Sequence, residues 1–284
     1  MEVVRTRAAL RHARAGLPAP VGAVLTMGAL HDGHLSLLTS AGAECASVVV
    51  SAFVNPTQFA PTEDFGRYPR DEAGDLGVLE AAGVDVAFVP PVEEIYSPGF
   101  ATAVDVGPIA EPLEGAARPG HFRGVATVVA ILFGLIEPER AYFGQKDAQQ
   151  ALVVRRLVDD LAMPIEIVVC PTIREADGLA FSSRNRNLSP AERAAAPVVF
   201  RALEEARRLV EAGARDAEAV RGRMREILAG ERLVKPEYVS VADAHTLQEL
   251  ERLHPGEVLL SLAARIGSTR LIDNVPLVVR SESA

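Results

Sequence analysis

The sequence predicts an α/β fold, in which a Rossmann-like parallel sheet domain is followed by a smaller α+β domain. Short apolar runs of strand type alternate with longer helical patterns through the first two-thirds of the 284 residues. Such alternation is typical of βαβ units, whose parallel strands are covered by helices on both faces. The runs are almost continuously apolar, as expected of strands buried on both faces. We therefore expect one domain over residues 1–173 and a second over 174–284.

The predicted strands of the first domain are short and rich in β-branched residues. They are Val21–Thr26, Ser47–Val54, Asp85–Val89, Ala141–Phe143 and Ile165–Val169. The segments between them have helical periodicity, and helices are predicted at His34–Glu44, Asp71–Ala82, Gly124–Ile136 and Asp147–Leu161. The most apolar stretch, Val125–Ile136, is shorter than the roughly 20 residues that a membrane span needs. It is therefore predicted to be a buried helix.

The pattern changes after about residue 173. Ser189, Pro190 and Glu192 form a helix-start signature, with serine as the cap, proline at the first helical position and glutamate three residues after the cap. Two helices are predicted, Pro190–Ala212, in which Pro197 is a candidate for a kink, and Asp216–Ala229. Three strands are predicted after them, at Glu237–Val241, Glu257–Ala264 and Thr269–Asp273.

Charge and cysteine content narrow the class of protein. The net charge of -9 and the pI near 5.3 argue against a general binder of nucleic acids or membrane surfaces, because such binders need an extended basic face. The two cysteines, Cys45 and Cys170, lie far apart and cannot form a disulfide framework. The first 15 residues lack the apolar core of a signal peptide. We expect a cytoplasmic protein with no nucleic-acid or membrane partner.

The segment after the first strand is the strongest candidate for a ligand site, because ligands gather at the carboxyl ends of parallel strands. Gly28 and Gly33 let the backbone approach a ligand, and a helix is predicted to begin near His34. A helix N-terminus suits phosphate. His31 and His34 are three residues apart and could donate to charge on a polyphosphate. The alternative is a pair of surface histidines, and a metal site would need a third ligand that is not nearby in the sequence.

Three further segments carry weaker signals when taken singly. Asn55 and Gln58 follow the second strand and suit hydroxyl and carboxylate groups, although Asn-Pro is also an ordinary turn. Lys146 follows Gly144 at the end of another strand and could meet a phosphate or be a solvated surface lysine. The segment Gly178–Asn185 is a small polar loop with one arginine, of the kind that closes over triphosphates or simply links domains.

Together these segments resemble the pantothenate synthetase family of the class I nucleotidyltransferases. Residues 26–34 are similar to the family's version of the HIGH signature. The other matching stretches, in the family's order, are Phe53–Phe59, Tyr68–Arg70, His121–Gly124, Phe143–Asp147 and Asp177–Asn185. The likeness extends from about residue 20 to residue 275. The HIGH signature alone would indicate only the superfamily, whereas the combination is specific.

The resemblance implies a reaction and its partners. ATP and (R)-pantoate would give pantoyl adenylate and pyrophosphate, and β-alanine would then attack to give pantothenate and AMP. The expected cofactors are ATP, as a substrate, and Mg²⁺. The expected assembly is a homodimer.

Residue roles follow from the resemblance alone. The expected catalytic residues are His34 as proton donor, His31 beside the phosphates, Lys146 reaching the phosphates, and Arg184. The expected ATP-binding residues are Met27, Gly28, Ala29, Leu30, His31, Asp32, Gly33, His34, Gly144, Gln145, Lys146, Asp147, Ile173, Phe181, Ser182, Ser183 and Arg184. The expected substrate-binding residues are Gln58, Gln150, Asn55 and Arg118. Asp75 matches an acidic position associated with Mg²⁺.

A few positions depart from the family pattern. Leu25 stands where the family usually has proline, Phe181 where methionine or leucine is usual, and Gln145 where glutamate is common. The acidic cluster near Asp75 is thin, with Gly74 before it and Val78 after it, which weakens the case for magnesium there. None of these changes removes a reacting group.

Two kinds of alternative stay open at this stage. One is another HIGH-type nucleotidyltransferase, which would not need the Asn55–Phe59 segment; an aminoacyl-tRNA synthetase fits less well because the chain is short and acidic. The other is a non-catalytic nucleotide sensor, against which the presence of His34, Lys146 and Arg184 argues.

Overall fold

The computed structural model describes residues 1–59 and 65–281 of the chain. Its contacts separate two compact units, of which the first comprises Met1–Gln145 and Gln149–Pro171 and the second Lys146–Ala148 and Thr172–Ala284. The domain boundary predicted after residue 173 stays a prediction, and residues 282–284 at its end lie outside the described residues. The two units are described separately below.

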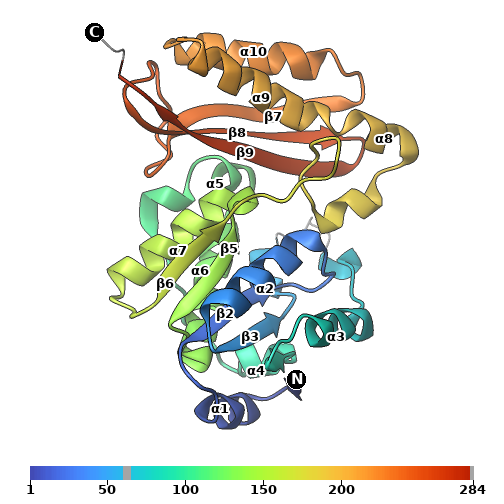
Figure 1. Ribbon diagram of the computed structural model, residues 1–284, viewed down its shortest axis with the longest axis vertical. Helices are drawn as coiled ribbons and strands as arrows, with labels where there is room; N and C mark the ends of the chain where they lie inside the picture. Colours follow the sequence, from blue (N-terminus) through green and yellow to red (C-terminus); the bar gives the residue numbers. More distant parts are fainter. Residues whose placement is uncertain (60–64, 282–284) are drawn as a thin grey trace. The chain divides into compact units, whose positions relative to one another are not determined.

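The first unit is built on one parallel sheet of six strands in the order β1-β4-β3-β2-β5-β6 (Figure 1). The strands are β1 (Glu2–Val4), β2 (Val21–Thr26), β3 (Ser47–Ala52), β4 (Val86–Phe88), β5 (Arg140–Gly144) and β6 (Glu166–Cys170). The five predicted strands are all present, with ends shifted by no more than two residues. The Rossmann-like class predicted from the alternation is confirmed.

Helices connect the strands. They are α1 (Arg7–Ala15), α2 (Asp32–Glu44), α3 (Glu72–Ala81), α4 (Val92–Ile95), α5 (Glu114–Ala117), α6 (His121–Ile136) and α7 (Ala148–Asp160). Short 3₁₀ turns are η1 (Pro56–Gln58), η2 (Phe65–Arg67), η3 (Gly107–Ala110) and η4 (Gln145–Asp147). The prediction missed β1 and α1, because β1 has only three residues and α1 buries only Leu10.

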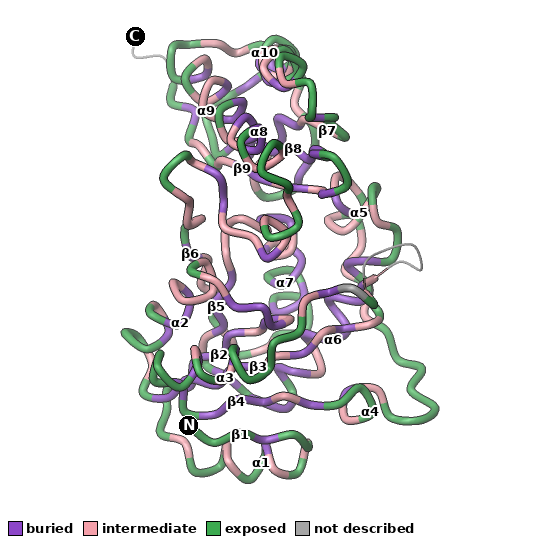
Figure 2. Tube along the Cα trace, turned by 90° about the vertical axis from the view of Figure 1, so that its right-hand side faces the viewer, coloured by how far each residue is buried: buried purple, intermediate pink, exposed green. Residues whose placement is uncertain are grey.

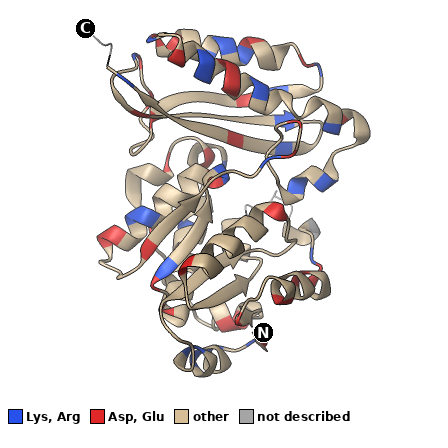
Figure 3. Cartoon of the chain, in the orientation of Figure 1, with Lys and Arg blue, Asp and Glu red and all other residues tan. Residues whose placement is uncertain are grey.

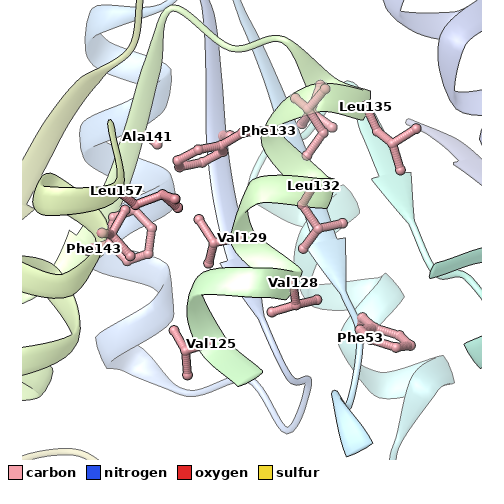
Figure 4. Close-up of a cluster of buried hydrophobic side chains, with 14 of the residues drawn as sticks. Phe53, Val125, Val128, Val129, Leu132, Phe133, Leu135, Ala141, Phe143 and Leu157 are labelled. Atoms are coloured by element: carbon pink, nitrogen blue, oxygen red, sulfur yellow. The ribbon is translucent and has the colours of Figure 1, made fainter. Parts of the chain in front are cut away.

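Two hydrophobic clusters cover the two faces of this sheet. Since side chains alternate along a strand, Ala141 and Phe143 of β5 join one cluster while Tyr142 joins the other. The first cluster includes α1, α6 and α7, and the second includes α2 and α3. Figure 4 shows Val129 and Phe133 of α6 packed beside Phe143 and Leu157. Figure 2 shows that the four inner strands, β2, β3, β4 and β5, are largely buried, which explains their continuous apolar character.

The order of the strands defines where a ligand can enter. The chain runs from β2 to β3 and then β4 on one side, whereas β5 pairs with β2 on the other side. The direction of winding therefore reverses at β2. In open parallel sheets such a switch point leaves a crevice at the carboxyl ends of the strands, and here those ends are followed by residues 27–31 and by Gln145.

The second unit is an antiparallel sheet with helices on it. Its strands are β7 (Val234–Asp243), β8 (Gly256–Ile266) and β9 (Thr269–Val279). Its helices are η5 (Ser183–Asn187), α8 (Pro190–Ala195), α9 (Val198–Glu211) and α10 (Ala217–Ala229). The apolar sides of α9 and α10 share a core with the strands, and Arg and Glu alternate on the outside (Figure 3). The smaller α+β fold is confirmed.

The helix predicted as Pro190–Ala212 is divided in two. Ser189 begins α8 with the predicted capping box, in which Glu192 N–H donates to the serine hydroxyl and the Glu192 carboxylate accepts from Ser189 N–H. Pro197 lies between α8 and α9. A proline inside a helix removes a backbone donor and clashes with the preceding turn, so the chain restarts there.

Within residues 1–59 and 65–281, no helix combines the length and the apolar character that crossing a bilayer requires. The most apolar segment is α6, which has 16 residues. Twelve of these are buried, including Phe122, Leu132 and Phe133. It is the buried helix that the sequence predicts.

The core around α6 generates a stability prediction. Phe133→Ala, at a side chain that is 2% exposed, should lower the free energy of unfolding by about 3–5 kcal/mol through lost burial and a cavity. Phe100→Ala is the matched control, because that ring is 38% exposed, and it should cost about 1 kcal/mol. Urea unfolding followed by circular dichroism measures both, and equal losses would contradict the assignment of the core.

Candidate functional site

The turn between β2 and α2 has an unusual backbone. Gly28 has φ of 82° and Ala29 has φ of 54°, both in the left-handed region. The Gly28 N–H donates to Thr26 Oγ1 at 3.1 Å, and the N–H groups of Ala29 and Leu30 both donate to Asp75 at 2.8 Å. A Cβ on Gly28 would lie 2.8 Å from an Asp75 oxygen, so glycine is required here.

The two predicted histidines lie side by side at the start of α2. Their ring centroids are 4.1 Å apart. His31 is the N-cap of α2, and its Nδ1 accepts the N–H of Gly33 at 3.2 Å. In the neutral ring the proton is therefore on Nε2, which makes this nitrogen a donor. His34 Nε2 lies 3.3 Å from Thr26 Oγ1. The turn thus presents two imidazoles at a helix N-terminus, an arrangement that suits an anion.

Asn55 and Gln58 form one hydrogen-bonded unit after β3. Gln58 donates from Nε2 to Met27 Sδ at 3.2 Å and accepts at Oε1 from Asn55 Nδ2 at 3.0 Å. Asn55 is 1% exposed, and its Oδ1 accepts the hydroxyls of Thr57 and Tyr96. Burial raises the pKa of Tyr96, opposed by its hydrogen bonds to Thr57 and Asn55, so that the phenol stays protonated and donates. Asn55 therefore supports Gln58, and direct binding of substrate by Asn55 stays a prediction.

The backbone of Gln58 is held from the other side by the start of α6. His121 Nδ1 lies 2.8 Å from the Gln58 carbonyl oxygen and donates to it, since a carbonyl only accepts. His121 Nε2 then accepts from Arg118, which also donates to the Gln58 carbonyl at 3.4 Å. A Cβ on Gly124 would lie 2.4 Å from the Thr57 carbonyl, so α6 approaches η1 closely because Gly124 has no side chain.

The two neighbouring glutamines of α7 differ in environment. Gln149 is 6% exposed and binds the segment before α6, accepting from Glu114 N–H at 3.0 Å and donating to the carbonyls of Ile109 and Pro112. Gln150, the predicted substrate ligand, is half-buried. Gln149 is thus a structural residue, and the role of Gln150 stays a prediction.

Lys146 belongs to the second unit, and it is anchored by β9. Its backbone carbonyl accepts from Asn274 Nδ2 at 2.9 Å, and its ammonium lies 3.3 Å from Asp147 Oδ1. The Asp147 side chain is 47% exposed, whereas that of Lys146 is 19% exposed. Sequence reasoning missed Asn274 because it lies 128 residues from Lys146 and follows no motif of its own.

The chain from Ile173 to Phe181, which includes the first residues of the expected polar loop Gly178–Asn185, forms a hairpin. Arg174 and Ala180 form a β-bridge, and Phe181 N–H donates to the Ile173 carbonyl at 3.0 Å. The Arg174 guanidinium binds both oxygens of Asp273, at 2.6 and 3.0 Å, and stacks on Phe200 at 3.8 Å from the ring centroid. Such bidentate pairs fix geometry as well as charge.

The carboxylate of Asp273 is 3% exposed. Burial raises its pKa, against the opposing effect of Arg174. Sequence reasoning assigned no role to Arg174 or Asp273, although Arg174 directly follows Ile173 in the sequence.

Ser182 and Ser183, which the resemblance places in the family's counterpart of the KMSKS loop near residues 181–185, follow this hairpin. Ser182 is the N-cap of η5, and its hydroxyl accepts Arg184 N–H at 3.2 Å. Ser183 is 8% exposed. Asn185 donates to Glu175 at 3.1 Å and to the Ala180 carbonyl at 3.0 Å, which ties η5 to the hairpin. The roles of Phe181, Ser182, Ser183 and Arg184 toward ATP stay predictions.

Metal binding was also expected, at Asp75. Across residues 1–59 and 65–281, no group of three or more His, Cys, Asp or Glu side chains is arranged to hold a metal ion. Each oxygen of Asp75, the predicted ligand, already accepts a backbone N–H. A magnesium ion would thus take most of its ligands from phosphate oxygens and water, as this ion usually does.

Comparison with known proteins identifies the family. A family profile described as pantoate-beta-alanine ligase matches residues 2–276. The chain belongs to this family. It is 59% identical over 274 residues, covering 96% of this chain and 99% of the relative, to a protein of Chloroflexus aggregans named pantothenate synthetase. A relative of that name from Moorella thermoacetica is 52% identical, with 98% of this chain and 99% of the relative covered.

Solved structures of the ligase family share the fold. The crystal structure of pantothenate synthetase from Thermus thermophilus has a TM-score of 0.93 and 50% identity, and covers 99% of this chain and 100% of its own. A pantoate-beta-alanine ligase from Francisella tularensis, complexed with beta-gamma ATP and beta-alanine, has a TM-score of 0.80 and 34% identity, covering 97% of each chain. The resemblance stated from the motifs is confirmed at the level of family and fold.

The close approach of α6 to η1 gives a testable asymmetry between two glycines of one helix. Gly124→Ala should destabilise the protein by about 1–3 kcal/mol, because the new methyl group would overlap the Thr57 carbonyl. Gly134→Ala is the matched control. Apart from the backbone of the helix itself and the neighbouring residues, no atom lies within 4 Å of the position that a Cβ would take at Gly134. This change should therefore stabilise the helix by roughly 0.5–1 kcal/mol. Thermal denaturation of both variants measures the difference, and two shifts of the same sign would contradict the contact.

Proposed function

We propose that this chain is an ATP-dependent ligase that condenses (R)-pantoate with β-alanine. The carboxylate oxygen of pantoate attacks the α-phosphorus of ATP, the bond from that phosphorus to the bridging oxygen breaks, and pyrophosphate leaves. The amine of β-alanine then attacks the acyl carbon of pantoyl adenylate. The carbon–oxygen bond to AMP breaks, the amine loses a proton, and pantothenate and AMP are released.

The observation that carries the proposal is the turn at the carboxyl end of β2, residues 27–34, which carries His31 and His34 and is called the histidine turn below. A family member without catalytic function could keep the fold, but it would not need two imidazoles 4.1 Å apart at the N-terminus of α2. Negative charge grows on the leaving pyrophosphate, and donors placed in advance stabilise it. The Nε2 hydrogen of His31 and the ring of His34 are such donors. This distinguishes the ligase from a passive nucleotide sensor.

Substrate recognition is assigned to the neutral side chains of the first unit. Gln58 is buried, fixed at both ends of its amide and close to Met27 of the histidine turn. An amide held in this way is a directional partner for the hydroxyl and carboxylate groups of pantoate. We assign Gln58, Gln150 and Arg118 to pantoate, with β-alanine near Gln58. Because Arg118 already binds His121, it acts at least partly by positioning Gln58.

Charge neutralisation by the second unit completes the proposal. Lys146 and Arg184 would bind phosphate, Asp147 the ribose, and Ile173 and Phe181 the adenine side, as the resemblance implies. The Asn274 and Asp273 contacts support this assignment, since they hold the chain at Lys146 and at the hairpin. Magnesium would arrive as the ATP complex and supply charge neutralisation there. A homodimer and a cytoplasmic location are further parts of the proposal.

A product assay tests the function directly. Purified protein is mixed with ATP, Mg²⁺, (R)-pantoate and β-alanine, and pantothenate, AMP and pyrophosphate are quantified by mass spectrometry. Equal amounts of the three products are expected, and their continued formation over many turnovers should depend on every substrate. ADP in place of AMP, or a nucleotide product that contains no pantoyl group, would instead indicate a different ligase or nucleotidyltransferase.

The order of the two steps is a second testable point. Without β-alanine, the enzyme should convert ATP and pantoate once per site, because the proposed donors act on phosphate and need no amine. We expect closure of the Gly178–Asn185 segment to exclude water from the adenylate, so that the intermediate persists. Rapid-quench sampling with labelled ATP measures the burst. Lys146→Ala should abolish it, whereas Lys235→Ala, at an exposed position of β7, should not. A burst that requires β-alanine would rule out the two-step scheme.

The histidine turn makes a prediction of its own. His34→Ala should lower kcat by about 10²–10³-fold, as expected for the loss of one transition-state donor. The fold should persist, since His34 is only half-buried at the start of α2. His12→Ala, on the exposed side of α1, is the matched control and should keep wild-type turnover. Steady-state kinetics measure both, and wild-type turnover in His34→Ala would remove the histidine from the mechanism.

A further inference from the structure

The carboxylate of Asp75 binds the histidine turn by accepting hydrogen bonds from two adjacent backbone N–H groups. Asp75 lies in the first turns of α3 and is 9% exposed. Its Oδ2 accepts Ala29 N–H and its Oδ1 accepts Leu30 N–H, both at 2.8 Å, from a position 45 residues along the chain from Leu30.

The backbone conformation of the turn explains why a charged acceptor is needed. The left-handed φ values of Gly28 and Ala29 point the next N–H groups to the same side, which makes a concave site for an anion. A non-glycine residue with a left-handed φ raises the conformational free energy of the chain, so surrounding contacts must hold it there. Hydrogen bonds to an ionised acceptor are about twice as strong as neutral ones. Asp75 therefore holds Ala29 in a conformation that an isolated chain would rarely adopt.

The histidine turn also sets the direction in which the two imidazole rings point. His31 follows Leu30 directly and caps α2, and His34 contacts Thr26, whose hydroxyl also accepts the Gly28 N–H. A change in the backbone conformation at Ala29 would thus move His31 at the start of α2 and would also change the distance between His34 and Thr26. Asp75 also occupies the Ala29 and Leu30 donors, so an anionic ligand has to be bound by the imidazoles and the N-terminus of α2.

We propose that Asp75 is a positioning residue for His31 and His34, and that this contact with the turn is its role in place of magnesium ligation. The inference rests on the proposed adenylation. A displacement of the order of 1 Å in a reacting group can cost about 10²-fold in rate. Asp75→Asn keeps the size of the side chain but replaces one acceptor by a donor facing a backbone N–H.

The first experiment measures adenylation kinetics as a function of Mg²⁺. Asp75→Asn should lower kcat by about 10–100-fold, with an unchanged half-saturating concentration of Mg²⁺ and an unchanged KM for pantoate. Asp71→Asn is the matched control. It removes the same charge from the start of the same helix, where its carboxylate caps α3 by accepting the Gly74 N–H, and asparagine also caps helices well. Recovery of Asp75→Asn activity at high Mg²⁺ or with Mn²⁺ would overturn the proposal in favour of metal ligation.

A double-mutant cycle separates positioning from general stabilisation. If Asp75 acts through the histidines, Asp75→Asn should cost less than about 3-fold in a background that carries both His31→Ala and His34→Ala, since both rings that it positions are then absent. A full 10–100-fold loss there would overturn the proposal. Gly28→Ala attacks the same contact from the other side, because its methyl group would meet the Asp75 carboxylate, and it should reproduce the Asp75→Asn kinetics.

Amide hydrogen exchange gives a readout that needs no turnover. Exchange in the peptide that spans residues 27–35 should be faster in Asp75→Asn than in the wild type and in Asp71→Asn, while exchange in α6 is unchanged. Unchanged exchange at residues 27–35 would overturn the inference whether or not the enzyme is active. A wild-type protein that fails to adenylate pantoate would contradict the proposed function while leaving the exchange result intact.

Discussion

The parallel pairing of β2 with β3 on one side and β5 on the other is the constraint on which the site of the first unit depends. Because all six strands run in the same direction, their carboxyl ends meet at one edge, and the reversal at β2 opens the crevice there. Three groups of candidate residues in the first unit follow from this. The histidine turn leaves β2, the Asn55–Gln58 unit leaves β3, and Gln145 leaves β5.

Within each unit, polar side chains near the candidate residues act mostly on backbone groups. Asp75 holds the histidine turn and His121 holds the Gln58 carbonyl in the first unit, and Asn274 holds the Lys146 carbonyl in the second. Buried polar groups are costly unless they are paired, so each such contact also selects one backbone conformation. The candidate substrate-binding side chains are thereby positioned by residues that need not touch substrate. Asn55 also holds Gln58 through its amide, and direct binding of substrate by Asn55 stays a prediction.

The sequence predicts those parts of the fold that are locally determined. β2 and β3 could be located because they are continuous apolar runs, and the start of α8 because its cap, proline and glutamate lie within four residues. The pairing of Arg174 with Asp273 could not, because the partners are 99 residues apart and only the fold joins them. The contacts of Asp75 with Ala29 and Leu30 could not be predicted for the same reason. Its acidic character is visible in the sequence, but its backbone partners are not.

The central claim is that a carboxylate is activated by transfer of AMP, and the fate of the carboxylate oxygen tests it most directly. Pantoate labelled with ¹⁸O in both carboxylate oxygens is turned over with ATP and β-alanine, and the products are separated by mass spectrometry. Adenylation predicts one ¹⁸O atom in each AMP and one retained in the amide of pantothenate. Label in inorganic phosphate or pyrophosphate, or unlabelled AMP, would contradict the account, because the carboxylate would then not have attacked the α-phosphorus.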